Sequence, residues 1–354
     1  MSDRALEAPA RAAVLRRDAA CQLAIVVAFA ALLVAAILVS LAIGRFPVSI
    51  DRVLGILLAP AIGGTVDWKP TEELVVWTVR LPRVLLAGVA GAGLALSGAV
   101  LQGIFRNPLV GPQTIGVSSG AALGGVTAIL IAGFGILVTV GAFAGAVVAL
   151  LLVLAIHRAD SVSPVLSLIL AGVVVGAFCG ALVGFVTFVA DPETKLPGIV
   201  FWLLGSFGTA TWPKLALASA CTVSAGGMLL AMRWRINVLS LGDEEARSLG
   251  ARPGPDRVIL LAGVCLIVAA QVAVSGTVGW VGLVVPNLAR MMVGADHRRL
   301  LPVATLIGAT FLIVADTCAR GISAAEIPVG LVTAIVGTPV FAYLLRRTAA
   351  DRSP

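Results

Sequence analysis

Long stretches that lack every charged residue constrain this chain more than any other feature. An α-helix needs about 20 apolar residues to cross a hydrocarbon core of roughly 30 Å, and several stretches free of Asp, Glu, Lys and Arg reach that length. They cover residues 21–44, 84–105, 107–156, 161–190, 258–289 and 327–345. The mean hydropathy of +1.07 lies far above that of soluble proteins. The sequence therefore predicts an all-α, polytopic membrane protein.

Turn residues and charges divide the chain into about ten predicted transmembrane helices. We expect them near residues 22–44, 83–105, 114–131, 134–157, 164–190, 198–232, 256–275, 279–294, 300–319 and 328–346. The sixth should be broken near Trp212-Pro213, because proline interrupts a helix. The less apolar segment 45–79 is predicted as an excursion at the outer face. One transmembrane domain then covers residues 22–347, between tails at 1–21 and 348–354.

The distribution of basic residues predicts which loops face the cytoplasm. Cytoplasmic loops carry an excess of Lys and Arg, and 17 of the 25 basic residues fall on the side of the N-terminus. They are Arg4, Arg11, Arg16, Arg17, Arg106, Arg158, Arg233, Arg235, Arg247, Arg252, Arg257, Arg290, Arg298, Arg299, Arg346, Arg347 and Arg352. We therefore expect a multi-pass protein of the cell inner membrane with both termini in the cytoplasm. This asymmetry, rather than nucleic-acid binding, accounts for the net charge of +7.

No motif for catalysis, nucleotide binding or metal binding accompanies the predicted helices. None of the three lysines lies in G-x-x-x-x-G-K-[ST], and there is no HExxH. The five cysteines are scattered singly, as small packing residues are. His157 and His297 stand beside loop arginines, where we expect solvated side chains. The sequence predicts a protein that is not an enzyme and that holds no metal and no cofactor.

One acidic residue inside an apolar region bears on whether an ion gradient could drive transport. Asp316 precedes Arg320 by four residues, which places both on one helix face, so we expect an ion pair near the outer end of that helix. A proton relay at Asp316 is the alternative, and it would make the chain an ion-coupled secondary carrier. A structural scaffold without transport is a third class. Since no ATPase motif is present, we expect the energy to come from a partner protein.

Four long motifs follow one another along the chain, at residues 80–125, 239–251, 276–320 and 326–347. The first contains the turn "RNPL", and the second reads "LSLGDEEARSLGA". In sequence and order they resemble the motifs of the FecCD family, the permeases of ABC importers for iron siderophores, haem and vitamin B12. One residue departs from the family pattern, because Asn287 stands where a His is usual.

The resemblance implies a fold, partners and a class of cargo. The fold is that of the vitamin B12 and iron-siderophore ABC permeases, with ten helices. The partners are a second permease subunit, expected to form a homodimer, two copies of a cytoplasmic ATP-binding subunit, and an extracytoplasmic substrate-binding protein. The cargo it implies is an iron chelate, either a ferric siderophore or haem. Vitamin B12 or another corrinoid is the alternative cargo.

The segment 239–252 is a short charged helix bounded by glycines in an otherwise apolar chain. Gly242 can break the preceding helix, Asp243 can cap a new one, and Gly250 can end it. The resemblance implies that this helix couples the permease to the ATPase. The residues of this predicted coupling segment are Leu241, Gly242, Asp243, Glu244, Glu245, Ala246, Arg247, Leu249 and Gly250. The alternative is a solvated loop helix with an Asp243–Arg247 pair.

The turn "RNPL" joins two predicted helices on the cytoplasmic side. Pro108 fixes its own backbone and restricts that of Asn107. The resemblance implies that Asn107, Pro108 and Leu109 form an inner gate below the cargo. An ordinary capped turn is the alternative.

Three arginines lie at the predicted outer face. The excess of basic residues on cytoplasmic loops does not explain their presence there. Arg80 and Arg83 flank Leu81-Pro82, and Arg320 ends the ninth predicted helix. The resemblance implies that they dock carboxylates of the substrate-binding protein, a task that suits the planar guanidinium fork. The alternative is that these side chains reach from lipid into the headgroup layer.

Overall fold

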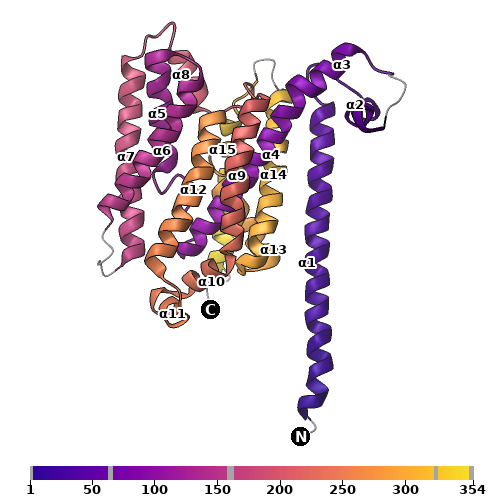
Figure 1. Ribbon diagram of the computed structural model, residues 1–354, viewed down its shortest axis with the longest axis vertical. Helices are drawn as coiled ribbons and strands as arrows, with labels where there is room; N and C mark the ends of the chain where they lie inside the picture. Colours follow the sequence, from indigo (N-terminus) through magenta and orange to yellow (C-terminus); the bar gives the residue numbers. More distant parts are fainter. Residues whose placement is uncertain (1–2, 63–66, 158–162, 323–325, 351–354) are drawn as a thin grey trace.

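The computed structural model describes residues 3–62, 67–157, 163–322 and 326–350, and within these ranges it contains helices and loops but no strand (Figure 1). Seven helical stretches there are long and apolar enough to cross a membrane, and three shorter apolar helices accompany them. The long stretches are Ala20–Ala42 of α1 (Asp3–Ala42), Pro70–Ile104 with α4 (Leu81–Ile104), α6 (Ile136–Ile156), α7 (Pro164–Val189), α9 (Trp212–Ala231), α12 (Pro253–Ser275) and α14 (His297–Ile322). The shorter helices are α5 (Val117–Ala132), α13 (Val281–Val293) and α15 (Val329–Ala350). They match the predicted helices in order, which confirms the all-α membrane fold.

The second predicted helix begins much earlier than its charge-free run. The helix runs without a break from α3 (Pro70–Leu74) through a π-helical stretch (Val75–Arg80) into α4. Part of the segment 45–79 therefore belongs to this long helix, and the rest contains α2 (Ile50–Ile62). Arg80 does not end the helix, because the backbone of Arg80 and Leu81 keeps right-handed helical angles.

The predicted helix 198–232 is two helices, α8 (Leu196–Leu203) and α9, separated by residues 204–211. The break was predicted beside Pro213, and α9 does begin at that place. Proline suits the first turn of a helix, because its missing N–H would have no intrahelical partner there. The short α8 leaves the chain non-helical for several residues before α9 starts.

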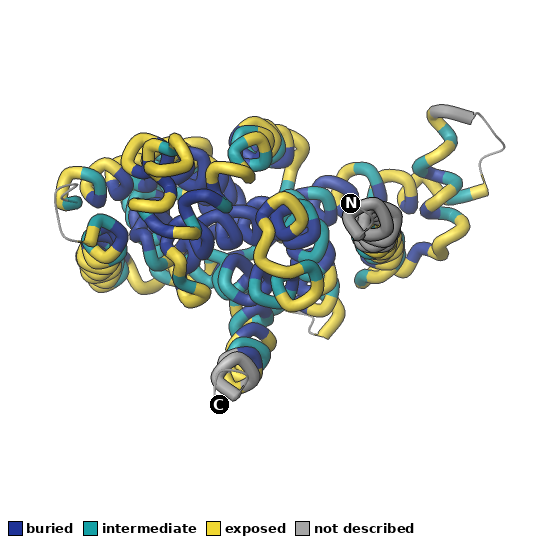
Figure 2. The backbone as a smooth tube through the Cα atoms, turned by 90° about the horizontal axis from the view of Figure 1, so that it is seen from below, coloured by how far each residue is buried: buried dark blue, intermediate teal, exposed yellow. Residues whose placement is uncertain are grey.

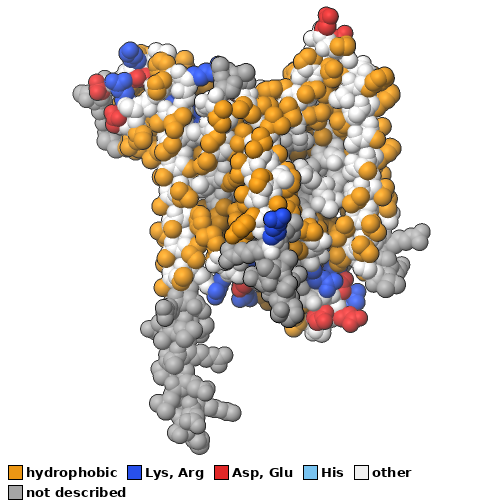
Figure 3. Space-filling view, turned by 180° about the vertical axis from the view of Figure 1, so that it is seen from behind, with side chains coloured by type: hydrophobic (Ala, Val, Ile, Leu, Met, Phe, Trp, Pro, Cys, Tyr) orange, Lys and Arg blue, Asp and Glu red, His pale blue; other side chains and the backbone are white. Residues whose placement is uncertain are grey.

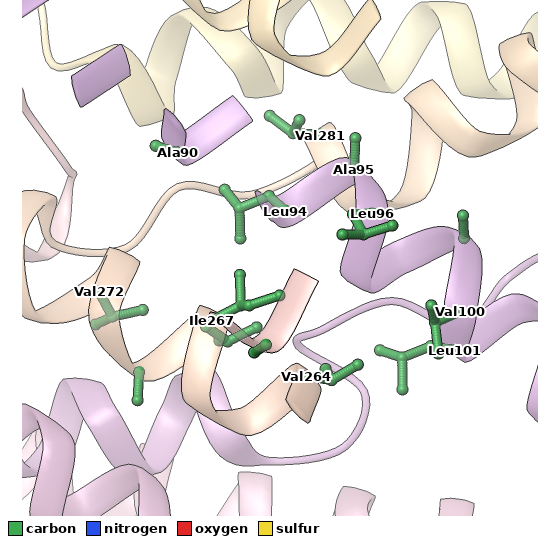
Figure 4. Close-up of a cluster of buried hydrophobic side chains, with 14 of the residues drawn as sticks. Ala90, Leu94, Ala95, Leu96, Val100, Leu101, Val264, Ile267, Val272 and Val281 are labelled. Atoms are coloured by element: carbon green, nitrogen blue, oxygen red, sulfur yellow. The ribbon is translucent and has the colours of Figure 1, made fainter. Parts of the chain in front are cut away.

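Glycine contacts hold α4 at the centre of the bundle. A methyl group added at Gly91 would overlap the carbonyl oxygen of Gly308 in α14, and one added at Gly98 would overlap that of Gly282 in α13. In lipid, where no hydrophobic drive joins helices, such close backbone approach supplies the packing energy. Figure 4 shows apolar side chains of α4, α12 and α13 gathered in this region.

The two ends of the bundle carry different segments. The start of α1, the end of α15, α10 (Arg233–Leu241) and α11 (Asp243–Ser248) lie at one end, below in Figure 1, which we call the inner end. The opposite, outer end carries α2, α3 and α8. Figure 3 shows charged side chains gathered at both ends with an apolar belt between them. Figure 2 shows buried residues in the middle of the bundle. Arg158 and Arg352, which contribute to the predicted orientation, lie outside the described residues.

Three non-helical segments, residues 105–116, 204–211 and 276–280, enter the bundle between helices. Polar backbone inside a bilayer needs partners within the protein, and the second and third segments find partners at each other's edges. The Ser206 N–H donates to the Ser275 carbonyl at 2.8 Å. The Thr277 hydroxyl donates to the carbonyl of Leu203. The polar groups at the break after α12 thus form hydrogen bonds with those at the break before α9.

We expect Gly91→Ala to destabilise the protein by about 1–3 kcal/mol, because the added methyl group overpacks the α4–α14 crossing. Gly227→Ala is the matched control, since Gly227 lies in α9 and has open space around its Cα. Both changes remove one helical glycine, so any gain in helix propensity is common to them. The measurement is the thermal unfolding midpoint in detergent. Equal midpoints for the two variants would contradict the close approach of α4 and α14.

Candidate functional site: the inner and outer ends of the bundle

The short helix α11 is closed at both ends by glycines in unusual backbone conformations. Gly242 separates α10 from α11 at φ 137°, and Gly250 follows α11 at φ 80°. The Gly250 N–H donates to the Arg247 carbonyl at 3.0 Å, and the Ala251 N–H donates to the Ala246 carbonyl at 2.9 Å. This pair of bonds is a Schellman closure, which ends a helix tightly. The glycine-bounded helix expected from the sequence is therefore present.

Asp243 has a different role from the two that the sequence indicated. Gly242, and not Asp243, occupies the N-cap position, and the Asp243 carboxylate bonds to Arg257 of α12 rather than to Arg247. One of its two bonds joins Asp243 Oδ2 to Arg257 Nη1 at 2.9 Å. Hydrogen bonding to Arg257 holds the pKa of Asp243 below its usual value. The ionised pair ties α11 to the first turn of α12.

The surface of α11 combines acidic and apolar groups. Ala246 is buried, whereas Glu244 and Glu245 are exposed at the inner end, where Figure 3 shows acidic side chains below the apolar belt. Leu241 and Leu249, which flank the helix, are 59% and 52% exposed. Exposed leucines beside a polar rim are typical of interfaces between separable proteins.

The turn after α4 is fastened to α13. The Asn107 side-chain oxygen accepts the Leu109 N–H at 2.9 Å. The Asn287 side chain donates to the Pro108 carbonyl at 3.1 Å, and Leu109 is 49% exposed. Asn287 thus holds the turn in place. No local sequence pattern indicates this contact, because Pro108 and Asn287 lie 179 positions apart.

A cavity of about 150 Å³ lies between this turn and the break before α13, lined by Leu109, Leu94 and Trp280 among others. Trp280 has φ 68°, a left-handed conformation that costs energy for a bulky residue. Its ring meets Phe341 of α15 edge to face at 6.3 Å. Trp280 lines this cavity, and the sequence analysis did not single it out. Its position after a glycine at a helix break was the available signal.

Arg80 and Arg83 are buried and Arg320 is half-buried, and all three are bonded within the protein in the conformation described. Their docking to a substrate-binding protein stays a prediction. Arg80, 4% exposed, donates to the carbonyls of Leu41 at 2.6 Å and Ala42 at 3.1 Å, at the end of α1. Arg83, 8% exposed, bonds to both oxygens of Asp316. The Arg320 side chain, 8% exposed, forms the predicted ion pair with Asp316 at 3.1 Å.

Asp316 is neutralised twice. Arg83 Nη2 lies 2.9 Å from Asp316 Oδ1, and Arg83 also reaches Glu326 at 3.0 Å. The other buried acids of the described residues are paired as well, Glu72 with Arg52 and Asp256 with Arg235. A proton relay needs an acid that can exchange its proton, and none of these buried acids is free of an arginine.

The two histidines differ. His297 is 3% exposed, and its Nδ1 lies 2.7 Å from the side-chain oxygen of Asn237. The expectation of a solvated His297 is therefore wrong, because the start of α14 packs against α4 and α10. His157 is half-buried and lies 3.1 Å from the Ser167 hydroxyl. Within the described residues no group of three or more His, Cys, Asp and Glu side chains could hold a metal ion.

Comparison with known proteins agrees with this architecture. Residues 32–347 match the model of the FecCD transport family. The molybdate import permease of Haemophilus influenzae is 45% identical over 320 residues, which cover 89% of this chain and 93% of that protein. The hemin transport permease of Yersinia pestis is 42% identical over 298 residues, covering 81% and 88%. The cobalamin import permease of Halobacterium salinarum is 38% identical over 348 residues, covering 89% and 94%.

A solved structure has the same fold. It is an inward-facing conformation of a transporter assigned to the metal-chelate type of ABC transporters, with a TM-score of 0.82 and 42% sequence identity. The match covers 91% of this chain and 99% of that one. The family match, the permease relatives and the shared helical fold lead to one conclusion. This chain belongs to the FecCD transport family and is a permease of an ABC importer.

Proposed function

We propose that this chain moves an iron chelate, a ferric siderophore or haem, from the outer side of the inner membrane to the cytoplasm, driven by ATP hydrolysis on a partner subunit. The observation that carries the proposal is the glycine-bounded helix α11, whose exposed acids and leucines offer a docking surface at the inner end. The inner end is then cytoplasmic, together with both termini. The relatives named for cobalamin and molybdate make a corrinoid and an oxyanion the alternative cargoes.

The ATP-binding subunits dock on α11 in this proposal. The Asp243–Arg257 pair and the Schellman closure make α11 a rigid extension of α12. A rigid surface transmits a displacement of the ATPase, whereas a solvated loop would absorb it. With two permease subunits, two copies of the ATPase are needed.

A second permease subunit completes the pathway in this proposal. α15 packs only lightly on the bundle and leaves Ile335 71% exposed and Tyr343 63% exposed. α15 also carries Phe341, the residue that meets Trp280. A homodimer that joins across this side would enclose the break at residues 276–280 between two copies, with lipid covering the remaining apolar belt.

A substrate-binding protein delivers the cargo to the outer end. Arg80, Arg83 and Arg320 could contact its carboxylates only by exchanging internal partners, such as Glu326, which is 35% exposed. In the conformation described they join α1, α4 and α14. We therefore assign them first to the integrity of the outer end.

Reconstitution into liposomes tests the proposed function. The purified permease, its ATPase and its binding protein should take up ⁵⁵Fe-labelled siderophore or haem only when ATP is supplied to the ATPase. Uptake driven by a proton gradient without the ATPase would instead identify a secondary carrier. Absence of uptake of any iron chelate, cobalamin or molybdate would exclude import as the function.

The double change Glu244→Arg and Glu245→Arg should abolish ATP-driven uptake while the protein stays folded and inserted. Reversing both exposed acids removes charge complementarity with the ATPase without disturbing a buried contact. Glu193→Arg is the control, because Glu193 is an exposed acid at the outer end. The measurements are co-purification of the ATPase and uptake. Normal values of both in the double variant would remove α11 from the interface.

The inner gate should be closed by crosslinking. In a variant that lacks the exposed Cys21 and Cys318, Leu109→Cys should form a disulfide with its symmetry mate and block uptake. Reduction should restore uptake, because the cysteine itself leaves the turn held by Asn287. If the oxidised protein transports at the rate of the reduced protein, the gate does not lie at Leu109.

Arg83→Met should lower the stability of the permease alone by about 3–5 kcal/mol, because it leaves a buried carboxylate with less compensation. Arg45→Met is the control, since Arg45 is exposed near the same end. Unfolding is measured without any binding protein. A residue that acts only in docking would leave this stability unchanged, and that result would contradict the structural role of Arg83.

A further inference from the structure

A cavity of about 490 Å³ opens at the inner end, next to the turn that follows α4. Its lining residues come from the ends of α4, α10 and α15, from the start of α14 and from α13. Its polar lining residues are Gln102, Arg106, Asn107, Asn287, Arg290 and His297, with Ser240 at the edge. No Asp or Glu lines it among the described residues. Apolar residues line the rest of the cavity, and its charged lining residues are all positive.

The two arginines of this cavity are Arg106, which is exposed, and Arg290, which is half-buried. Arg83, Arg257 and Arg320 each meet a carboxylate. Within the described residues, neither Arg106 nor Arg290 has a carboxylate within salt-bridge distance. Uncompensated charge on low-dielectric walls concentrates the electric field inside a cleft and attracts counter-ions.

Asn287 positions one of the two guanidinium groups. Its side-chain nitrogen donates to the carbonyls of Leu283 at 2.8 Å and Pro108 at 3.1 Å. These two bonds leave its oxygen to accept from Arg290 Nη1 at 3.1 Å. The amide therefore holds Arg290 at the cavity wall with the remaining N–H groups of the guanidinium available to a ligand. A planar fork of this kind binds an oxyanion through two parallel hydrogen bonds.

A buried amide completes the lining. Gln102 is 3% exposed, and its nitrogen donates to the Leu283 carbonyl at 3.2 Å. Its oxygen has no partner in the protein. A buried acceptor without a hydrogen bond is unfavourable, and an O–H group of a protonated oxyanion or of a water carried with it would satisfy this oxygen. His297 adds no donor, because its Nδ1–H is directed to Asn237.

We infer that this cavity binds an oxyanion group, and that the group belongs to the cargo as it leaves the inner gate. The inference rests on the proposed function and narrows its cargo to anions, either a small tetrahedral oxyanion or the carboxylate arm of an anionic chelate. A haem, with two propionates, fits this class. The whole of a corrinoid does not fit a space of this size.

Molybdate is the probe, because it is a small, stable dianion. Binding of ⁹⁹Mo-labelled molybdate is measured on the permease–ATPase complex in nanodiscs of zwitterionic lipid. Arg290→Gln should weaken binding at least about tenfold, which corresponds to the loss of charge-assisted hydrogen bonds. Arg290→Lys should retain part of the affinity. Arg298→Gln, which changes an exposed arginine at the same end outside the cavity, should leave it unchanged.

Three results would overturn the inference. The first is absence of molybdate binding. The second is an affinity of the Arg290→Gln variant equal to that of the unchanged protein. The third is a loss of affinity in the Arg298→Gln control equal to that in Arg290→Gln.

Nanodiscs with phosphatidylglycerol and addition of ATP distinguish other sources of an oxyanion. If phosphatidylglycerol or ATP occupies the cavity and molybdate does not, the site belongs to a lipid or a nucleotide. ATP-driven uptake of an iron chelate that survives these failures would leave the proposed function intact.

Discussion

The need to satisfy backbone polar groups inside lipid governs this structure. A helix meets this need by itself, but the chain leaves the helical conformation within the bundle before α9 and before α13. These breaks lie against each other, so that Ser206 bonds to Ser275 and Thr277 bonds to Leu203. Two backbones that form hydrogen bonds with each other must lie close together. Glycine, which has no side chain, permits this approach at the breaks. The same breaks place Trp280 and the turn at Pro108 where a pathway can open.

Charge inside the bundle follows a related rule. Desolvation of an isolated ion is very unfavourable, so buried charges are found in pairs. Asp316 obeys the rule with two arginines, and Asp243 obeys it with Arg257. Among the described residues, two buried or half-buried arginines depart from this rule. Arg80 at the outer end donates to backbone carbonyls of α1, whereas Arg290 in the inner cavity donates only to the side chain of Asn287. One set of arginines joins helices, and the other remains available to a ligand.

Local and long-range features were not equally predictable. Charge-free runs predicted the helices, because the length of a span depends only on the bilayer. Gly242 and Gly250 predicted α11, because helix ends depend on a few neighbouring residues. The sequence analysis missed those ion-pair partners that only the folded chain brings together. Arg83 meets Asp316 across 233 positions, and Asp243 pairs with a residue 14 positions away rather than with Arg247, four away. Burial of His297 likewise depends on α4 and α10, which no local pattern reveals.

The unbroken course of α12 has a mechanical consequence. Its inner end is fixed to α11 through Arg257, and its outer end at Ser275 accepts the bond from Ser206. Between them lie 23 residues, a rod of about 34 Å at 1.5 Å per residue. This rod is buried along most of its length and contains no break. A displacement of α11 would therefore reach the segment at Ser206 through a single helix, with no loop between them to absorb it.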